Sequence, residues 1–169
     1  MRGQRDESAE GDALRLLAIR GRSVSEVRER LLKRGFSQGE VEETLQNLLK
    51  KKYLNDQAFA SDWARGRLVR APVGRIRIAS ELKAKGVGEA EINTALTEVY
   101  DQADELRLAS MAVQRRLPLI QHLPQEVKRR RLFTYLQRRG FPSTVILSVL
   151  AEQLGKPSGD DEGGDVDDL

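Results

Sequence analysis

The chain has 169 residues, of which 33% are charged and 5% aromatic, a composition typical of helical proteins with a modest core and a heavily solvated surface. There is no cysteine, so disulfides and thiolate metal sites are excluded. The single histidine, His122, leaves too few imidazole groups for a histidine-based metal site and only one candidate for a catalytic triad. No apolar run is long enough to span a membrane, and residues 1–7 are too polar for a secretory signal. We therefore expect a cytoplasmic protein that does not enter a membrane.

The charges are unevenly distributed along the chain. Residues 156–169 contain one lysine and six acidic residues, a net charge of −5, so the rest of the chain carries +8 within the total of +3. A basic body with an acidic tail is common in proteins that meet nucleic acid. The tail is either a solubilising segment or a competitor of DNA for the basic surface.

Three segments of the chain align without gaps on a glycine. The glycines, Gly35, Gly86 and Gly140, are 51 and 54 residues apart, and each follows a basic residue and precedes an apolar one. Apolar residues also recur four positions before each glycine and six and ten positions after it. Chance does not readily match five positions in three segments, so we predict a tandem array with about 50 residues in each unit.

The spacing of the apolar residues predicts three helices in each unit. The leading helices are expected at 12–20, 56–70 and 101–117. In the first unit, the apolar residues from Val24 to Leu32 and from Val41 to Leu49 define the second and third helices. Each repeat glycine then follows a basic last turn, where a left-handed residue ends a helix, and Ser37 and Pro142 open the next helix in units one and three.

The expected fold is therefore all-α, with three tandem three-helix repeats in an elongated, curved array. A single unit is too small to bury much core alone, so neighbouring units should pack on one another. We expect a disordered N-terminus at 1–10, repeats at 11–55, 56–100 and 101–155, and a disordered acidic tail at 156–169, because neither end can bury enough apolar area to offset its ordering entropy.

Arginine and lysine are concentrated in the second and third units. Their planar or compact cations suit phosphate or carboxylate recognition, and in the helix expected at about 126–139 the arginines lie opposite the apolar face. The candidate residues for binding a partner or DNA are Arg65, Arg67, Arg70, Arg75, Arg77, Lys83, Lys85, Arg130, Arg131 and Arg138. The alternative is a solvated surface paired with the many acidic residues, although no acid balances the cations between Lys128 and Arg139.

The remaining candidate residues do not suggest chemistry. Phe59 and Trp63 are four positions apart on one helix face and favour core packing over base stacking. His122 lies in a predicted loop between Pro118 and Pro124, no nucleophile has a base partner, and no phosphate loop follows a strand. We therefore expect no enzyme activity, no cofactor and no metal.

The chain resembles the RecX family. The resemblance lies in the triple unit, in the junction Tyr53-Leu54-Asn55-Asp56-Gln57-Ala58-Phe59, and in Gly74 followed by Arg77-Ile78, Glu81-Leu82 and Lys85-Gly86-Val87. It covers about residues 13–154. Two positions depart from the family pattern: Lys52 stands where a glycine usually precedes the tyrosine, and Ala79 stands where a basic residue often follows the Arg-Ile pair.

The resemblance implies a partner and a function. RecX proteins bind the RecA recombinase filament on single-stranded DNA, lie in its helical groove, and limit its ATPase, strand exchange and growth in recombination, DNA repair and the SOS response. A monomer that binds free DNA weakly would fit this role. Two other interpretations remain open: a helical protein that acts directly on duplex DNA through helix-turn-helix-like pairs, and a helical scaffold that binds no nucleic acid.

Overall fold

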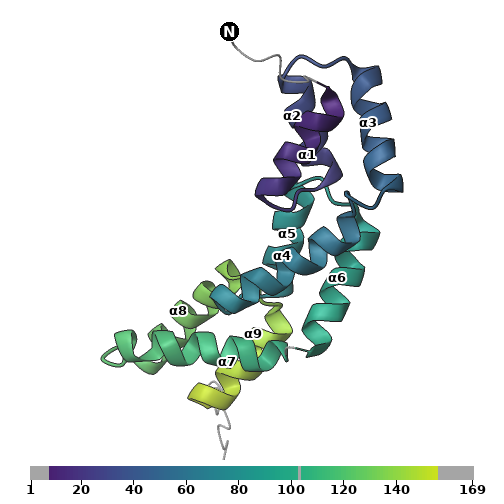
Figure 1. Cartoon of the computed structure of the whole chain (residues 1–169). Coiled ribbons are helices and arrows are strands. Elements are labelled where there is room, and N and C mark those ends of the chain that lie inside the picture. Colours follow the sequence, from purple (N-terminus) through teal and green to yellow (C-terminus); the bar gives the residue numbers. More distant parts are fainter. Residues whose placement is uncertain (1–7, 103, 156–169) are drawn as a thin grey trace, which may run out of the picture.

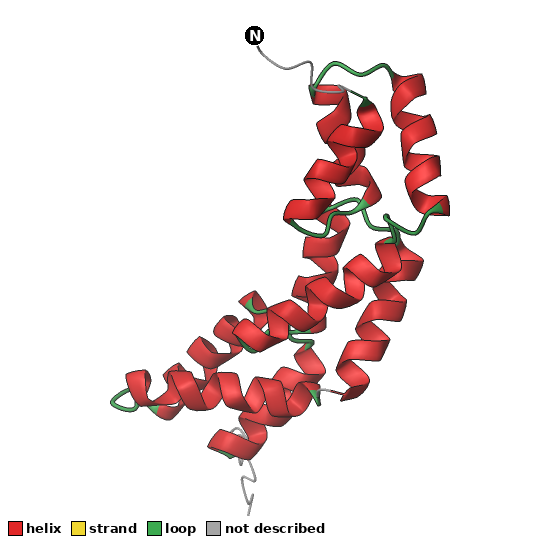
Figure 2. Ribbon diagram, in the orientation of Figure 1, coloured by secondary structure: helices red, strands yellow, loops and turns green. Residues whose placement is uncertain are grey.

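The computed structural model describes residues 8–102 and 104–155, and within them it has nine α-helices, one short 3₁₀ helix and no strand (Figures 1 and 2). The helices are α1 (Ala9–Ile19), α2 (Val24–Lys33), α3 (Gln38–Lys50), α4 (Asp56–Arg70), α5 (Arg75–Ala84), α6 (Glu89–Gln102), α7 (Glu105–Arg116), η1 (Leu117–Ile120), α8 (Gln125–Arg138) and α9 (Ser143–Leu154).

The helices form three consecutive groups along a curved molecule. Figure 1 shows α1–α3 at one end, α4–α6 in the middle and α7–α9 at the other end, with the axis bending between them. We call these groups module 1, module 2 and module 3. The predicted all-α fold of three three-helix repeats in an elongated, curved array is confirmed.

Local signals in the sequence explain where several helices begin and end. Ser23 and Ser37 each form a capping box with the glutamate three positions later, which satisfies free amide groups at the starts of α2 and α3. The repeat glycines Gly35, Gly86 and Gly140 have φ angles of 95°, 71° and 81°. Each therefore occupies the left-handed region that terminates the preceding helix, as the repeat pattern predicts.

The first helix begins earlier than the sequence analysis expects. Residues 9 and 10, assigned there to a disordered N-terminus at 1–10, belong to α1, while residues 1–7 lie outside the described part. The side chain of Ser8 accepts a hydrogen bond from the Gly11 amide and caps the helix. Glu10 also pairs with Lys51 at 2.6 Å, which joins the start of α1 to the end of α3.

The border between modules 2 and 3 lies later than expected. The apolar spacing predicts a third unit that begins at residue 101, but α6 continues to Gln102, and α7 begins only at Glu105. The N-cap of α7 is Asp104, whose carboxylate accepts hydrogen bonds from the amides of Leu106 and Arg107. This nearby cap sets the start of the helix. The acidic tail at 156–169 lies outside the described residues.

Modules 2 and 3 share one hydrophobic core, whereas module 1 has its own. A single cluster of buried apolar residues extends from Ala60 in α4 to Leu150 in α9. A second cluster, from Ala9 to Leu54, belongs to module 1 alone. The protein is therefore a two-module body with a third module attached through a joint.

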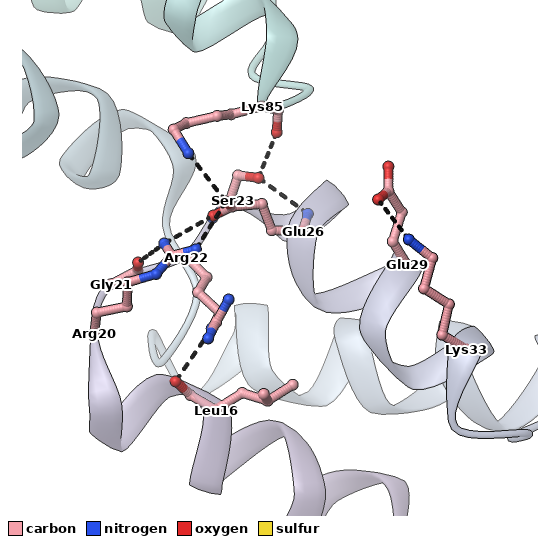
Figure 3. Close-up of polar contacts among 9 residues, drawn as sticks. All are labelled: Leu16, Arg20, Gly21, Arg22, Ser23, Glu26, Glu29, Lys33 and Lys85. Atoms are coloured by element: carbon pink, nitrogen blue, oxygen red, sulfur yellow. Dashed lines mark hydrogen bonds and ion pairs between the residues drawn. The ribbon is translucent and has the colours of Figure 1, made fainter.

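The joint between modules 1 and 2 is polar. The Ser23 hydroxyl donates to the Lys85 carbonyl at 2.5 Å, and the Val24 amide donates to Asp56 at 2.8 Å. Glu26 accepts from Lys85 at 3.1 Å and from Arg20 at 3.0 Å (Figure 3). Burial raises the pKa of Glu26, but the hydrogen bonds from Arg20, Lys85 and the Ser23 amide outweigh it and hold the pKa at about 2.

Backbone contacts hold module 2 against module 3. The Gly74 amide donates to the Arg139 carbonyl at 2.9 Å, and the Ile76 amide donates to the Gly140 carbonyl at 3.1 Å. A Cβ on Gly74 would overlap the Gly140 carbonyl group, and a Cβ on Gly140 would overlap the backbone of Arg77. The start of α5 and the end of α8 can approach this closely only because both positions are glycine.

Candidate partner and nucleic-acid interface

The candidate arginines of module 3 lie on the solvent side of α8. Leu132 and Leu136 are fully buried and fix one face of the helix in the shared core. Arg130, Arg131 and Arg138 are exposed, and none of them forms an ion pair within the described residues. This is the arrangement expected from the apolar spacing of the helix and from the lack of acids between Lys128 and Arg139.

These three arginines border a hollow of about 420 Å³ between α8 and the end of α7. Arg116 and Tyr135 complete its polar and aromatic lining. The Arg116 guanidinium lies 5.7 Å from the centroid of the Tyr135 ring, and the Arg139 guanidinium lies 4.9 Å from it. Four exposed or half-buried guanidinium groups thus surround one hollow, which suits an anion with several oxygen atoms.

Arg139 has a structural part in this arrangement. Its side chain donates to the Pro72 carbonyl at 2.8 Å, and its own carbonyl accepts from Gly74. Arg77 reaches the Arg138 carbonyl at 3.4 Å. The basic side chains of α5 and α8 are therefore brought together at the joint between modules 2 and 3.

Most of the candidate arginines of module 2 are paired with acids of the same chain. Arg65 pairs with Glu98 and Asp62. Arg67 makes two hydrogen bonds to Glu81, at 2.8 and 2.9 Å, and Arg77 pairs with the same carboxylate at 3.2 Å. Burial raises the pKa of Glu81, but hydrogen bonds from Arg67, Trp63 and Arg77 bring it below its usual value.

Two further candidates have partners in neighbouring modules. Arg75 pairs with Glu105 of α7 at 2.7 Å and lies 5.2 Å from the Tyr100 ring centroid. Lys85 pairs with Glu26 of α2 and lies 4.2 Å from the centroid of Trp63. These cations hold the modules together, so using them for binding would disturb an existing contact.

Arg70 and Lys83 differ from the other module 2 candidates. Both are exposed, and neither forms an ion pair within the part of the chain that is described. The candidate set therefore divides into five paired residues and five exposed cations without a paired carboxylate. The exposed cations, which we call the open cations, are Arg70, Lys83, Arg130, Arg131 and Arg138.

The aromatic residues of α4 pack against the core of modules 2 and 3, but they are only half-buried. The ring centroids of Phe59 and Trp63 are 6.1 Å apart, and the Trp63 indole nitrogen donates to Glu81 at 3.1 Å. The core packing favoured from the sequence is present, with part of each ring left uncovered. Tyr53, which the sequence also places among the aromatic residues at the start of unit two, is 60% exposed.

The described residues contain no group of three histidine, cysteine or acidic side chains that could hold a metal ion. His122 is exposed in the loop before α8, as its position between two prolines predicts. None of the described helices is both long and apolar enough to cross a membrane. The described residues thus form a surface of exposed cations and half-buried aromatic rings, held in place by hydrogen bonds between the modules.

Comparison with known protein families matches each module separately. Residues 9–48 match the first three-helix domain of RecX, residues 55–96 match the second, and residues 103–150 match the third. Among curated proteins, the regulatory protein RecX of Pelodictyon phaeoclathratiforme is 33% identical over 150 residues, covering 89% of this chain and 91% of its own length. RecX of Mycobacterium marinum is 35% identical over 152 residues, covering 89% and 87%.

Solved structures support the same fold. The crystal structure of RecX from Lactobacillus salivarius superposes with a TM-score of 0.79 at 19% identity, covering 85% of this chain and 93% of its own. A second RecX crystal structure gives a TM-score of 0.75 at 23% identity, covering 86% and 69%. With all three domain matches in order and relatives similar over nearly their whole length, the chain belongs to the RecX family of regulatory proteins.

Proposed function

We propose that this protein regulates the RecA recombinase by binding in the groove of the RecA filament on single-stranded DNA. It would thereby limit ATP hydrolysis, strand exchange and filament growth during recombination and DNA repair. The observation that carries the proposal is the exposed arginine surface of α8, with Arg130, Arg131 and Arg138 around one hollow, in a chain of the RecX family. Such a surface would contact phosphates of the DNA or acidic patches of the recombinase.

The division of the cations supports a particular mode of binding. Arg75 and Lys85 pair across the joints between modules, and Arg65, Arg67 and Arg77 pair within module 2. The open cations carry no such pair and stay available for a partner. A curved array of three linked modules can contact more than one filament subunit at once. Weak contacts then add through effective concentration, so that substoichiometric amounts suffice to slow the filament.

The protein would act as a cytoplasmic monomer without a cofactor or a catalytic step of its own. Its effect would come from occupying a surface that the filament needs in order to grow or turn over. Free DNA would bind more weakly than the filament, because only part of the contact surface would be used.

The test is the rate of DNA-dependent ATP hydrolysis by RecA at increasing amounts of this protein. We expect the rate to fall when the protein is well below one molecule for each RecA subunit. A duplex-binding protein would give another pattern: it would shift duplex DNA without RecA, and it would slow ATP hydrolysis only by competing for DNA. An unchanged rate at equimolar protein would contradict the proposal.

A further inference from the structure

A groove of about 470 Å³ lies between modules 1 and 2, away from the α8 arginines. It is formed by the end of α1, the turn before α2, the junction after α3 and one face of α4. One wall is aromatic and the rim is basic. The residues that carry the argument are Tyr53, Phe59 and Trp63 on the wall and Arg22, Lys52 and Arg70 on the rim.

The aromatic wall combines held rings with an open one. Trp63 is fixed on one side by its hydrogen bond to Glu81 and by the Lys85 ammonium 4.2 Å from its ring centroid. Phe59 packs beside it at 6.1 Å between centroids. Tyr53 is 60% exposed. The groove thus combines two rings held in place, Phe59 and Trp63, with the exposed ring of Tyr53, an arrangement that suits stacking of a flat ring.

The rim of the groove carries positive charge that the protein does not neutralise. Among the described residues, Arg22, Lys52 and Arg70 form no ion pair, and the one acid that lines the groove, Asp62, is 82% exposed and lies 3.6 Å from Arg65. Burial, followed by repulsion from Arg20 and Arg30, lowers the pKa of Arg22. An anion entering the groove would relieve that repulsion.

Lys52 adds an independent observation. It has a φ of 59°, the one positive φ outside glycine in the described residues. A side chain in this left-handed region is strained, and a glycine would remove the strain. The strained residue is a lysine whose side chain lines the groove, so the strain falls at one of the cations of the rim.

We propose that this groove binds single-stranded nucleic acid, with one or more bases stacked on the Tyr53, Phe59 and Trp63 wall and phosphates against Arg22, Lys52 and Arg70. Duplex DNA hides its base faces inside the stack and cannot use the wall. An acidic peptide would use the cations and leave the rings unsatisfied, whereas a single strand uses both. The two sites share the open cation Arg70, but the groove and the α8 hollow have no lining residue in common. The proposed function and this site can therefore each fail alone.

The chain offers a direct probe, because Trp63 is its only tryptophan. The intact protein is titrated at low salt, without recombinase, with a decamer of thymidylate and with a phosphodiester decamer of the same length that lacks bases. Trp63 fluorescence reports occupancy of the groove, and the anisotropy of a labelled decamer reports affinity. We expect saturable quenching by the thymidylate strand and much weaker binding of the strand without bases.

Two variants test the wall and the rim. Tyr53→Leu removes an exposed ring and should weaken thymidylate binding about tenfold, or about 1.4 kcal/mol, while the melting temperature stays unchanged. Lys52→Gly should weaken binding several-fold while the melting temperature stays the same or rises, since strain is released. The matched control is Lys50→Gly, which removes an exposed lysine of the same segment that does not line the groove. It should leave the affinity within about twofold.

The outcomes separate cleanly. Equal binding of the strands with and without bases, or full affinity in both Tyr53→Leu and Lys52→Gly, would show that any contact is only electrostatic and would overturn the proposal. Quenching by an acidic peptide as strong as that by thymidylate would assign the groove to a protein partner and also overturn it. Lys50→Gly weakening as much as Lys52→Gly would mean that net charge, not the groove, sets the affinity.

Discussion

Replacing Gly74 by alanine is predicted to weaken the joint between modules 2 and 3 severely. The added Cβ would overlap the Gly140 carbonyl, which is backbone and cannot rotate away. Separating the two chains would cost about 1–3 kcal/mol for overpacking, and the loss of the two hydrogen bonds at 2.9 and 3.1 Å would add about 0.5–1.5 kcal/mol each. Alanine also lowers the conformational entropy of the unfolded chain, which offsets about 0.4–1 kcal/mol of this loss. We expect a net loss of about 1 to 5.5 kcal/mol.

The assay is equilibrium unfolding in urea followed by helical circular dichroism, with the midpoint and slope measured for each variant. Gly66→Ala is the matched control, because Gly66 lies inside α4 with open space around it. That change should raise the stability by about 0.5–1 kcal/mol through helix propensity. If Gly74→Ala unfolds at the wild-type midpoint, the two glycines do not hold the modules together as described. An equal loss in Gly66→Ala would refute the steric reasoning.

Three further changes test other parts of the molecule. Gly86→Val should destabilise the protein by about 1–2 kcal/mol or more, because Gly86 has a φ of 71° and its Cβ would overlap the Ser25 side chain; an unchanged melting temperature would contradict this. The pKa of Glu26 is lowered from 4.5 to about 2, so its ionised form stabilises the folded state above about pH 4.5, and this stability is lost as the pH falls toward about 2. Wild type and Glu26→Gln should therefore differ by on the order of 2–3 kcal/mol at neutral pH and converge in acid. Parallel pH profiles would show that Glu26 has no such role. Deleting residues 156–169 should leave the melting temperature unchanged and, if the tail shields the basic body, tighten DNA or filament binding mainly at low salt; an identical affinity at all salt concentrations would leave only a solubilising role.

The sequence predicts the fold well where the signals are local. The three repeat glycines follow helices with basic last turns, and each ends its helix with a positive φ. The range 56–70 is reproduced residue for residue by α4. The errors lie at Ala9 and at residue 101, where a cap one residue before the helix start, Ser8 or Asp104, decided the boundary. Several polar residues near each boundary could cap the helix, and the apolar spacing alone does not distinguish among them.

The candidate site is predicted less evenly, because pairing depends on residues distant in sequence. Arg65 meets a glutamate 33 positions away, and Lys85 meets one 59 positions away. No local pattern reveals these pairs, so the sequence could not separate paired from open cations in module 2. In α8 the reverse holds, since no acid lies between Lys128 and Arg139 in the chain, and among the described residues none pairs with Arg130, Arg131 or Arg138. The groove between modules 1 and 2 arises from the joint itself and is invisible in either module alone.

The most direct test of the central claim compares two double variants in the RecA ATP hydrolysis assay. Arg130→Ala with Arg131→Ala removes two open cations of α8, and Lys33→Ala with Lys50→Ala removes two exposed lysines of module 1. Both variants lose the same net charge and should keep the wild-type helical content and melting temperature. We predict that the double arginine variant inhibits RecA much more weakly. The slope of its affinity against salt concentration should also fall by about two units, one for each lost phosphate contact. The double lysine variant should change little. Equal loss of inhibition in the two variants would contradict the account, because the effect would then be one of net charge rather than of this surface.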